Sequence, residues 1–312
     1  MRYVVTGGAG FIGSHLVAAL VDRGDDVVVL DDFSTGHREN LAPWSSRIVV
    51  IEGSITDLAT CARAMQGAAY VLHQAALPSV PRSIIDPVLS HAVNATGTLN
   101  VLVAARDAGV RRVVYASSSS VYGDTPELPK RETMLPRPRS PYAVAKLAGE
   151  QYCHAFSTSY GVETVALRYF NVFGPRQDPS SPYSGVVARF LQAATRGETP
   201  TITGDGEQTR DFTYVTNVVM ANLLACSSPA AVGRACNIGF GSRVSLNDLW
   251  SRVRALAGTS ATPIYLPPRA GDVRDSLADT DLACELLGYA PLIDLDEGLA
   301  RTMRHFTGSS LA

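Results

Sequence analysis

The chain has 312 residues, 46% of them hydrophobic, which is enough for one large domain or two ordinary ones, each with its own core. Its 27 basic and 29 acidic residues leave a net charge of −2, and the basic residues are scattered along the chain, which argues against nucleic acid or an anionic membrane as a partner. We therefore expect small-molecule partners.

The chain begins with a strand, a glycine loop and a helix that follow one another without a gap. An apolar run over residues 2–6 predicts a buried strand, the loop Gly-Gly-Ala-Gly-Phe-Ile-Gly follows, and residues 14–21 predict a helix. Gly7 permits the tight turn, Gly10 lets backbone amides approach a pyrophosphate at the helix N-terminus, and Gly13 lets helix and strand pack closely. The pattern predicts a dinucleotide-binding loop.

The next predicted strand, residues 27–30, ends in two carboxylates, Asp31 and Asp32. A carboxylate at this place binds the hydroxyls of the adenosine ribose. Because it also repels a 2′-phosphate, the sequence favours NAD over NADP as the cofactor.

Strand-like and helix-like segments alternate through about residue 170. The strands are expected at 48–51, 70–74, 113–116 and 164–169, and the longer helices at 88–108 and 141–159. Such alternation predicts an α/β fold with a doubly wound parallel sheet of the Rossmann type. Ligands of this architecture bind beyond the carboxyl ends of the strands, where Gly7, Asp31, Gln74, Ser117 and Tyr169 all fall, so we expect a single cofactor cleft.

Tyr142 and Lys146 form a Tyr-x-x-x-Lys pair on the second of these helices. Residues four apart share a helix face, so the ammonium can lie beside the phenol and stabilise the phenolate. Lowering the pKa of a phenol from about 10 toward neutrality needs roughly 4 kcal/mol, which an adjacent cation and a positive nicotinamide ring can supply in a poorly solvated cleft. We expect Tyr142 to be an acid/base group whose pKa is lowered.

The sequence changes character after Gly174-Pro175. A stretch rich in Pro, Ser and Gly precedes a helix expected over residues 186–195, and shorter elements follow. We expect a Rossmann domain at 1–170 and a smaller C-terminal α/β substrate domain at 171–312, with the alternative that later segments return to the first domain.

Targeting and redox signals are weak. Met1 leads directly into the first strand, and no apolar stretch is expected to reach membrane-spanning length, so we expect a cytoplasmic protein. The five cysteines are far apart and without C-x-x-C spacing, which favours buried reduced thiols and no metal site: Cys61, Cys153, Cys226, Cys236 and Cys284.

Taken together, these motifs resemble the extended short-chain dehydrogenase/reductases that act on nucleotide sugars, and most closely the UDP-N-acetylglucosamine 4-epimerases. The likeness runs nearly end to end. Besides the glycine loop and Ser140-Pro-Tyr-Ala-Val-Ala-Lys146, it includes His73-Gln-Ala-Ala76, Ser117-Ser-Ser-Ser-Val-Tyr-Gly123, Leu167-Arg-Tyr-Phe-Asn171, Phe173-Gly-Pro-Arg-Gln-Asp-Pro179, Tyr183, Gly204-Asp-Gly-Glu-Gln-Thr-Arg-Asp-Phe212 and Arg269-Ala-Gly-Asp-Val-Arg-Asp-Ser276.

The resemblance implies roles for individual residues. Ser118 would hydrogen-bond the reacting sugar oxygen, Tyr142 would be the acid/base, and Lys146 would hold the nicotinamide ribose. The implied NAD contacts are Gly7, Gly10, Phe11, Ile12, Gly13, Asp31, Asp32, Ser34, Thr35, Gly36, Ser54, Ile55, Gln74, Ala75, Ala76, Asn94, Ser117, Tyr142, Lys146 and Tyr169. The implied UDP-sugar contacts are Ser118, Ser119, Asn171, Val186, Gly204, Arg210, Arg269, Asp272 and Ser276.

Serines after Ser118 favour epimerisation over elimination. Related 4,6-dehydratases carry an acidic pair that eliminates water where this chain has Ser119 and Ser120. Without that pair, a 4-keto sugar would persist, rotate in the site and take the hydride back on its other face. The small Ser276 would leave space for a 2-acetamido group, which favours UDP-GlcNAc/UDP-GalNAc and also permits UDP-Glc/UDP-Gal. The alternatives are a dehydratase on the same scaffold and a non-catalytic NAD-sensing protein.

Two residues depart from the pattern of the relatives. Ser54 replaces an Asp that often contacts adenine, a contact that Asp57 could take over, and Pro78 replaces a Lys found in some relatives. The resemblance also implies a homodimer in which the helices at 88–108 and 141–159 of two subunits form a four-helix interface.

Overall fold

The computed structural model describes residues 1–180, 185–268 and 273–308. Its centre is a parallel sheet of seven strands in the order β11-β6-β5-β4-β1-β2-β3. The strands are β1 (Arg2–Thr6), β2 (Asp26–Asp31), β3 (Ile48–Glu52), β4 (Tyr70–His73), β5 (Arg112–Ser118), β6 (Glu163–Tyr169) and β11 (Arg234–Ile238). The predicted doubly wound α/β fold is confirmed.

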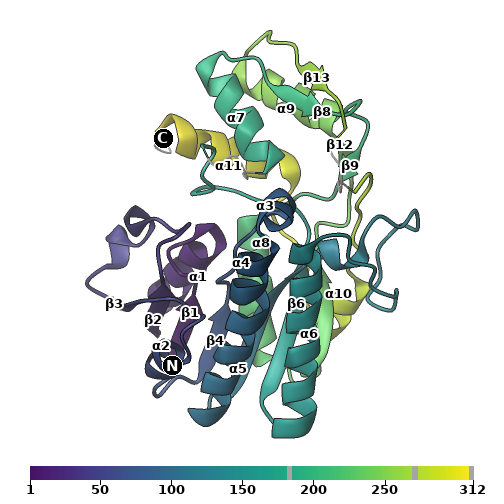
Figure 1. Ribbon diagram of the computed structural model, residues 1–312. Coiled ribbons are helices and arrows are strands. Elements are labelled where there is room, and N and C mark those ends of the chain that lie inside the picture. Colours follow the sequence, from purple (N-terminus) through teal and green to yellow (C-terminus); the bar gives the residue numbers. More distant parts are fainter. Residues whose placement is uncertain (181–184, 269–272, 309–312) are drawn as a thin grey trace.

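Helices cover both faces of the sheet, and Figure 1 shows α5, with α4 at its upper end, beside α6 in front of the sheet. One face packs against α1 (Phe11–Asp22), α8 (Val215–Ser227) and α10 (Asp281–Leu287); the other packs against α2 (Leu58–Ala64), α5 (Gly97–Asp107) and α6 (Pro141–Tyr160). Alternate side chains of one strand serve the two cores, with Tyr3 and Val5 on the first face and Val4 on the second. This explains why these strands are apolar without alternation.

The helix predicted at 88–108 is interrupted. It consists of α4 (Pro87–His91), a π-helical turn η3 (Ala92–Thr96) and α5. Inside the turn, buried Asn94 binds the backbone of Leu77 twice, accepting from its N–H at 2.8 Å and donating to its carbonyl at 3.0 Å. Contrary to expectation, the run Pro87–Asp107 is long and apolar enough to cross a membrane, but half of it is buried within the fold and α5 packs against the sheet.

A smaller lobe lies beyond the carboxyl ends of the strands, at the top of Figure 1. It contains α7 (Val186–Arg196), α9 (Leu246–Ala257), α11 (Leu295–Thr307) and two short strand pairs, β8 (Thr201–Thr203) with β13 (Ile264–Leu266) and β9 (Thr209–Arg210) with β12 (Val244–Ser245). Its core includes Phe190, Leu191 and Trp250. A further pair, β7 (Val172–Phe173) with β10 (Thr213–Tyr214), lies where the chain enters and leaves the lobe.

The chain passes between the sheet and the smaller lobe more than once. From β10 it returns to the sheet as α8 and β11, leaves again for β12, α9 and β13, returns as α10 and ends in α11. Strand β11 pairs with β6, although it follows α7, a helix of the smaller lobe, in the sequence. The sheet is completed by long-range pairing that local patterns do not specify.

The cysteines differ in burial. Cys61, Cys153, Cys226 and Cys236 are buried, whereas Cys284 is exposed. The expectation of buried thiols is thus wrong for Cys284, which lies on the outer face of the short helix α10, while Ala283 and Leu287 face the core.

Candidate active site

A cleft of about 760 Å³ opens at the carboxyl ends of the strands. The loops after β1, β2, β4 and β5 and the first turns of α6 line it. It brings together most of the predicted cofactor contacts: Gly7, Gly10, Phe11, Ile12, Gly13, Asp31, Asp32, Ser34, Thr35, Gly36, Ile55, Gln74, Ala75, Ala76, Ser117, Tyr142, Lys146 and Tyr169.

Two glycines of the loop, Gly7 and Gly13, leave no room for a Cβ. Gly7 has φ +68°, and a Cβ there would lie 2.7 Å from the backbone of Ala75; at Gly13 it would lie 2.1 Å from the carbonyl oxygen of Gly7. Gly10 is the N-cap of α1 and makes no side-chain capping hydrogen bond. The first-turn amides therefore face the cleft without a side-chain acceptor, which suits a bound pyrophosphate.

Asp31 supports the loop as well as lining the cleft. Its carboxylate accepts 2.8 Å hydrogen bonds from the N–H groups of Ala9 and Phe33, and burial raises its pKa above the usual value. Asp32 accepts from the Ser34 N–H at 3.0 Å. Two carboxylates at the end of β2 fit the ribose hydroxyls of NAD and disfavour a 2′-phosphate.

Two expected cofactor residues do not line the cleft. The Ser54 hydroxyl accepts from the N–H and hydroxyl of Thr56, and its neighbour Ile55 lines the cleft instead. Asn94 is occupied by the Leu77 backbone, so it shapes the cleft wall indirectly. Asp57, considered as a substitute for Ser54, caps α2 by accepting from two backbone N–H groups.

The Tyr-x-x-x-Lys pair occupies the first two turns of α6. The Ser140 hydroxyl caps this helix and Pro141 opens it, so the sequence places both residues at the cleft. The Lys146 Nζ donates to the carbonyl oxygen of Ala116 at 2.7 Å and lies 5.9 Å from the centroid of the Tyr142 ring.

The surroundings shift the pKa values of both residues against their charged forms. Burial lowers the pKa of Lys146 to about 8, partly offset by the charge of Glu150. Burial raises the pKa of Tyr142, while its hydrogen bond with Ser118 lowers it. In the chain without NAD, burial therefore disfavours the phenolate. The lowering of the phenol pKa by Lys146 together with the positive nicotinamide ring stays a prediction for the NAD-bound protein.

Ser118 and Ser119 lie at the turn that follows β5. The Ser118 hydroxyl accepts from the Ser120 N–H at 3.2 Å and so caps the 3₁₀ turn η4 (Ser119–Tyr122). This turn ends beside the start of α6, which brings Ser118 to Tyr142.

Other predicted substrate residues meet at the base of the smaller lobe. Asn171 Nδ2 donates to the Asp211 carbonyl at 3.0 Å and to the Ser276 hydroxyl at 3.2 Å, and Ser276 is buried. Arg210 donates to the backbone carbonyls of Thr209 and Arg274, both at 2.8 Å.

Two further predicted substrate residues belong to other elements of the smaller lobe. Val186 begins α7, and Gly204 follows β8 with φ +87°. Arg269, Asp272 and Tyr183 lie outside the described residues.

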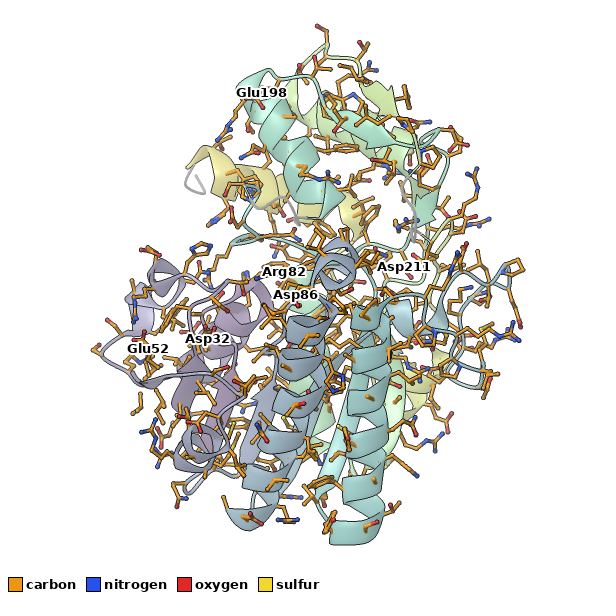
Figure 2. All side chains as sticks on the ribbon, in the orientation of Figure 1. Asp32, Glu52, Arg82, Asp86, Glu198 and Asp211 are labelled. Carbon is orange, nitrogen blue, oxygen red and sulfur yellow. The ribbon has the colours of Figure 1, made fainter. Side chains whose placement is uncertain are left out.

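Several cleft residues were not predicted from the sequence. Gln177, Asp178 and Ser180 line the cofactor cleft, and the Asp178 carboxylate lies 3.7 Å from the His37 ring on the facing loop. Gln177 and Asp178 belong to the motif at residues 173–179, which the family resemblance relates to the sugar. Arg82 lines the cleft from α3 (Val80–Ile85), and Figure 2 shows it where the sheet and the smaller lobe meet.

Comparison with known proteins places this architecture in one family. Residues 3–239 match the family described as "NAD dependent epimerase/dehydratase family". A UDP-glucose 4-epimerase from Mycolicibacterium smegmatis is 42% identical, the match covering 99% of this chain and 100% of that protein.

Two solved structures are similar over the same extent. The UDP-glucose 4-epimerase of Thermus thermophilus in complex with NAD has a TM-score of 0.92 and 39% identity, covering 99% of this chain and 100% of that one. The UDP-N-acetylglucosamine 4-epimerase of Methanobrevibacter ruminantium in complex with UDP-N-acetylmuramic acid has a TM-score of 0.94 and 38% identity, covering 99% of both chains. The NAD prediction is confirmed, and the chain belongs to the NAD-dependent epimerase/dehydratase family.

Proposed function

We propose that the chain is an NAD-dependent UDP-sugar 4-epimerase that acts through a transient 4-keto sugar. The observation that carries the proposal is that Tyr142 and Lys146 line the same cleft as the glycine loop and Asp31. Relatives and neighbours named as 4-epimerases, matching nearly the whole chain, support it.

In this reaction the protein moves a proton and holds the reactants. NAD supplies hydride acceptance and return when bound. Tyr142 takes the proton of the sugar 4-hydroxyl and later returns it, Ser118 hydrogen-bonds that oxygen, and the Lys146 ammonium favours the phenolate. The sugar turns between the two proton transfers, so the configuration at that carbon inverts without net redox change.

The serine turn favours epimerisation over the dehydratase alternative. Ser119 and Ser120 hold no acid or base that could remove the proton at carbon 5 and protonate a leaving hydroxyl at carbon 6. The serine turn therefore favours the return of hydride and proton over elimination of water from a keto sugar.

For the substrate, we infer UDP-GlcNAc/UDP-GalNAc, with UDP-Glc/UDP-Gal also accepted. Ser276 is small, and Asn171 donates a hydrogen bond to its hydroxyl. A small side chain at this position favours a site that tolerates a 2-acetamido group. Exclusion by one side chain is a coarse filter, so the plain sugars fit the same space.

The test is direct. Purified protein is incubated separately with UDP-GlcNAc and UDP-Glc, and the products are identified by NMR. We expect UDP-GalNAc and UDP-Gal; a 4-keto-6-deoxy or unsaturated product would support the dehydratase instead.

Tyr142→Phe tests the acid/base role. It should lower kcat by roughly 10²–10⁴-fold, because the general acid/base is lost, while NAD content stays unchanged. The transient NADH absorbance produced by a UDP-sugar should vanish as well. A wild-type protein that binds NAD but shows neither turnover nor this absorbance would be a sensor.

We also propose a division of labour, an assembly and a location. Residues 1–170 bind mainly NAD and residues 171–312 mainly the UDP-sugar, the chain forms a homodimer, and it is cytoplasmic. The dimer is supported by apolar side chains that α4 and α6 leave exposed: Val88, Leu89, Val144 and Tyr152.

A further inference from the structure

A buried polar network adjoins the serine turn that follows β5. Glu150 and Arg168, both 5% exposed, form its centre. The Glu150 carboxylate accepts from Arg168 Nε at 2.9 Å and from Nη2 at 2.7 Å, and it also accepts from the Ser117 hydroxyl. The pair is bidentate, so it fixes orientation as well as charge.

The network extends from the pair to the far end of the turn. Arg168 Nη1 donates to the Tyr122 hydroxyl at 2.8 Å, and that hydroxyl donates to Asn237 Oδ1 at 2.6 Å. Tyr122 is the last residue of η4 and Ser117 directly precedes Ser118, so the network holds both ends of the segment that carries Ser118. Arg168 on β6 is in register with both Ser117 on β5 and Asn237 on β11.

Glu150 of this network belongs to α6, the helix that also carries Tyr142 and Lys146. Tyr142, Lys146 and Glu150 follow one another at intervals of four on α6 and so share one face. On its own helix, Lys146 lies near Tyr142, Glu150 and Cys153. From the sheet, Tyr115 on β5 and His73 on β4 lie near it. Arg168 on β6 is linked to it through Glu150. Of these groups, Glu150 carries the negative charge.

We propose that Glu150 is a positioning residue of the epimerase site: held by Arg168, its carboxylate fixes the serine turn against the helix face of Tyr142 and Lys146 and keeps a negative charge one turn from the ammonium. The inference rests on the proposed function. A buried ion pair is weak evidence for stability, since apolar residues can replace it without loss. What an apolar pair would not provide is the set of directed bonds to Ser117 and Tyr122.

The test compares Glu150→Gln with Glu163→Gln. Glu163 pairs with the buried Arg112, Nε to carboxylate at 2.9 Å, at the opposite end of the same two strands. Glu150→Gln should lower kcat by roughly 10–100-fold through misplacement of the turn, with little change in KM or NAD content. Its high-pH limit of activity should also move to lower pH, because the charge that raises the pKa of Lys146 is gone.

Glu163→Gln should leave both kcat and the pH profile as in wild type. Wild-type kcat and pH profile in Glu150→Gln would overturn the inference, as would equal losses in the two variants, since these would indicate a structural role only. If Glu150→Gln does not fold, Tyr122→Phe decides: reduced kcat without a shifted pH limit supports the inference, and unchanged kcat overturns it. Absence of turnover in wild type would instead refute the proposed function.

Discussion

At the scale of single residues, the site balances two ionisations. Burial raises the pKa of Tyr142, the Ser118 hydrogen bond lowers it, and burial lowers the pKa of Lys146 to about 8. Activity needs an ionised phenol and a charged amine together. In the chain without NAD these two conditions do not overlap, because the pKa of Tyr142 lies above that of Lys146, so we propose that the positive nicotinamide ring brings the phenol pKa below that of the ammonium. With NAD bound, Tyr142 then sets the acidic limit of activity and Lys146 the basic limit.

Ser118→Ala should raise the acidic limit of activity, which Tyr142 sets. Removing a hydrogen bond that lowers the pKa of Tyr142 leaves that pKa higher, so the acidic limb of kcat should move to higher pH. At neutral pH kcat should fall by roughly tenfold to a hundredfold, the value of a hydrogen bond to a charged group. A pH–rate profile measures both. Thr158→Ala, an exposed hydroxyl further along α6, is the control, and an acidic limb that stays in place would contradict the assignment.

At the scale of elements, one carboxylate joins the loops that hold the predicted substrate residues. Asp211 is fully buried and accepts from the N–H groups of Phe240 at 2.9 Å, Gly241 at 3.1 Å and Ala278 at 3.0 Å. Figure 2 shows it near the level at which the sheet meets the smaller lobe. Asn171, which donates to the Asp211 carbonyl, and Ser276, two residues before Ala278, depend on this arrangement.

Asp211→Ala should cost about 3 kcal/mol or more in the free energy of unfolding, because three N–H groups lose their acceptor, and should raise KM for the UDP-sugar. Burial raises the pKa of Asp211 from 3.8 to about 6, so in wild type this group stabilises the fold more as pH falls through that value. Denaturant unfolding at neutral and mildly acidic pH should show the gap between the two proteins widening on acidification. Asp294→Ala, which removes an exposed helix cap, should leave KM unchanged.

Local signals in the sequence predicted the glycine loop, the succession of strands along the chain through β6 and the Tyr-x-x-x-Lys pair, because each depends on residues close together in the chain. They did not reveal the Glu150–Arg168 pair, although Arg168 stands within a quoted motif. Its partners Tyr122 and Asn237 are brought to it only by the pairing of β5, β6 and β11. The contact of Asn94 with Leu77 is likewise not visible in the sequence, because it forms only with the π turn.

At the scale of the whole molecule, apolar side chains collect on one side. Ile85 on α3, Val88 on α4 and Val144 on α6 are 76%, 78% and 51% exposed, and these helices pack beside one another. Such a surface is costly in a monomer and suits burial against a second copy.

Val88→Asp combined with Val144→Asp should therefore convert a dimer into a monomer, because each charge would be buried without a partner. Both positions are exposed in the single chain, so the melting temperature of the monomer should not collapse. Sedimentation at micromolar concentration measures the change, with Leu292→Asp, at a side chain that is 75% exposed, as control. A wild-type monomer, or a double variant that still dimerises, would count against the proposed assembly.

The repeated passage of the chain between the sheet and the smaller lobe limits how such enzymes can be recombined. In a hybrid of two relatives joined at one point after β6, the second relative would supply β11, α8 and α10 as well as the smaller lobe. Its β11 must then pair with β6 of the first relative, and its α8 must pack against α1 of the first relative. Exchanging specificity between relatives thus calls for separate grafts of residues 172–214, 244–266 and 295–307, with the intervening segments kept from the host.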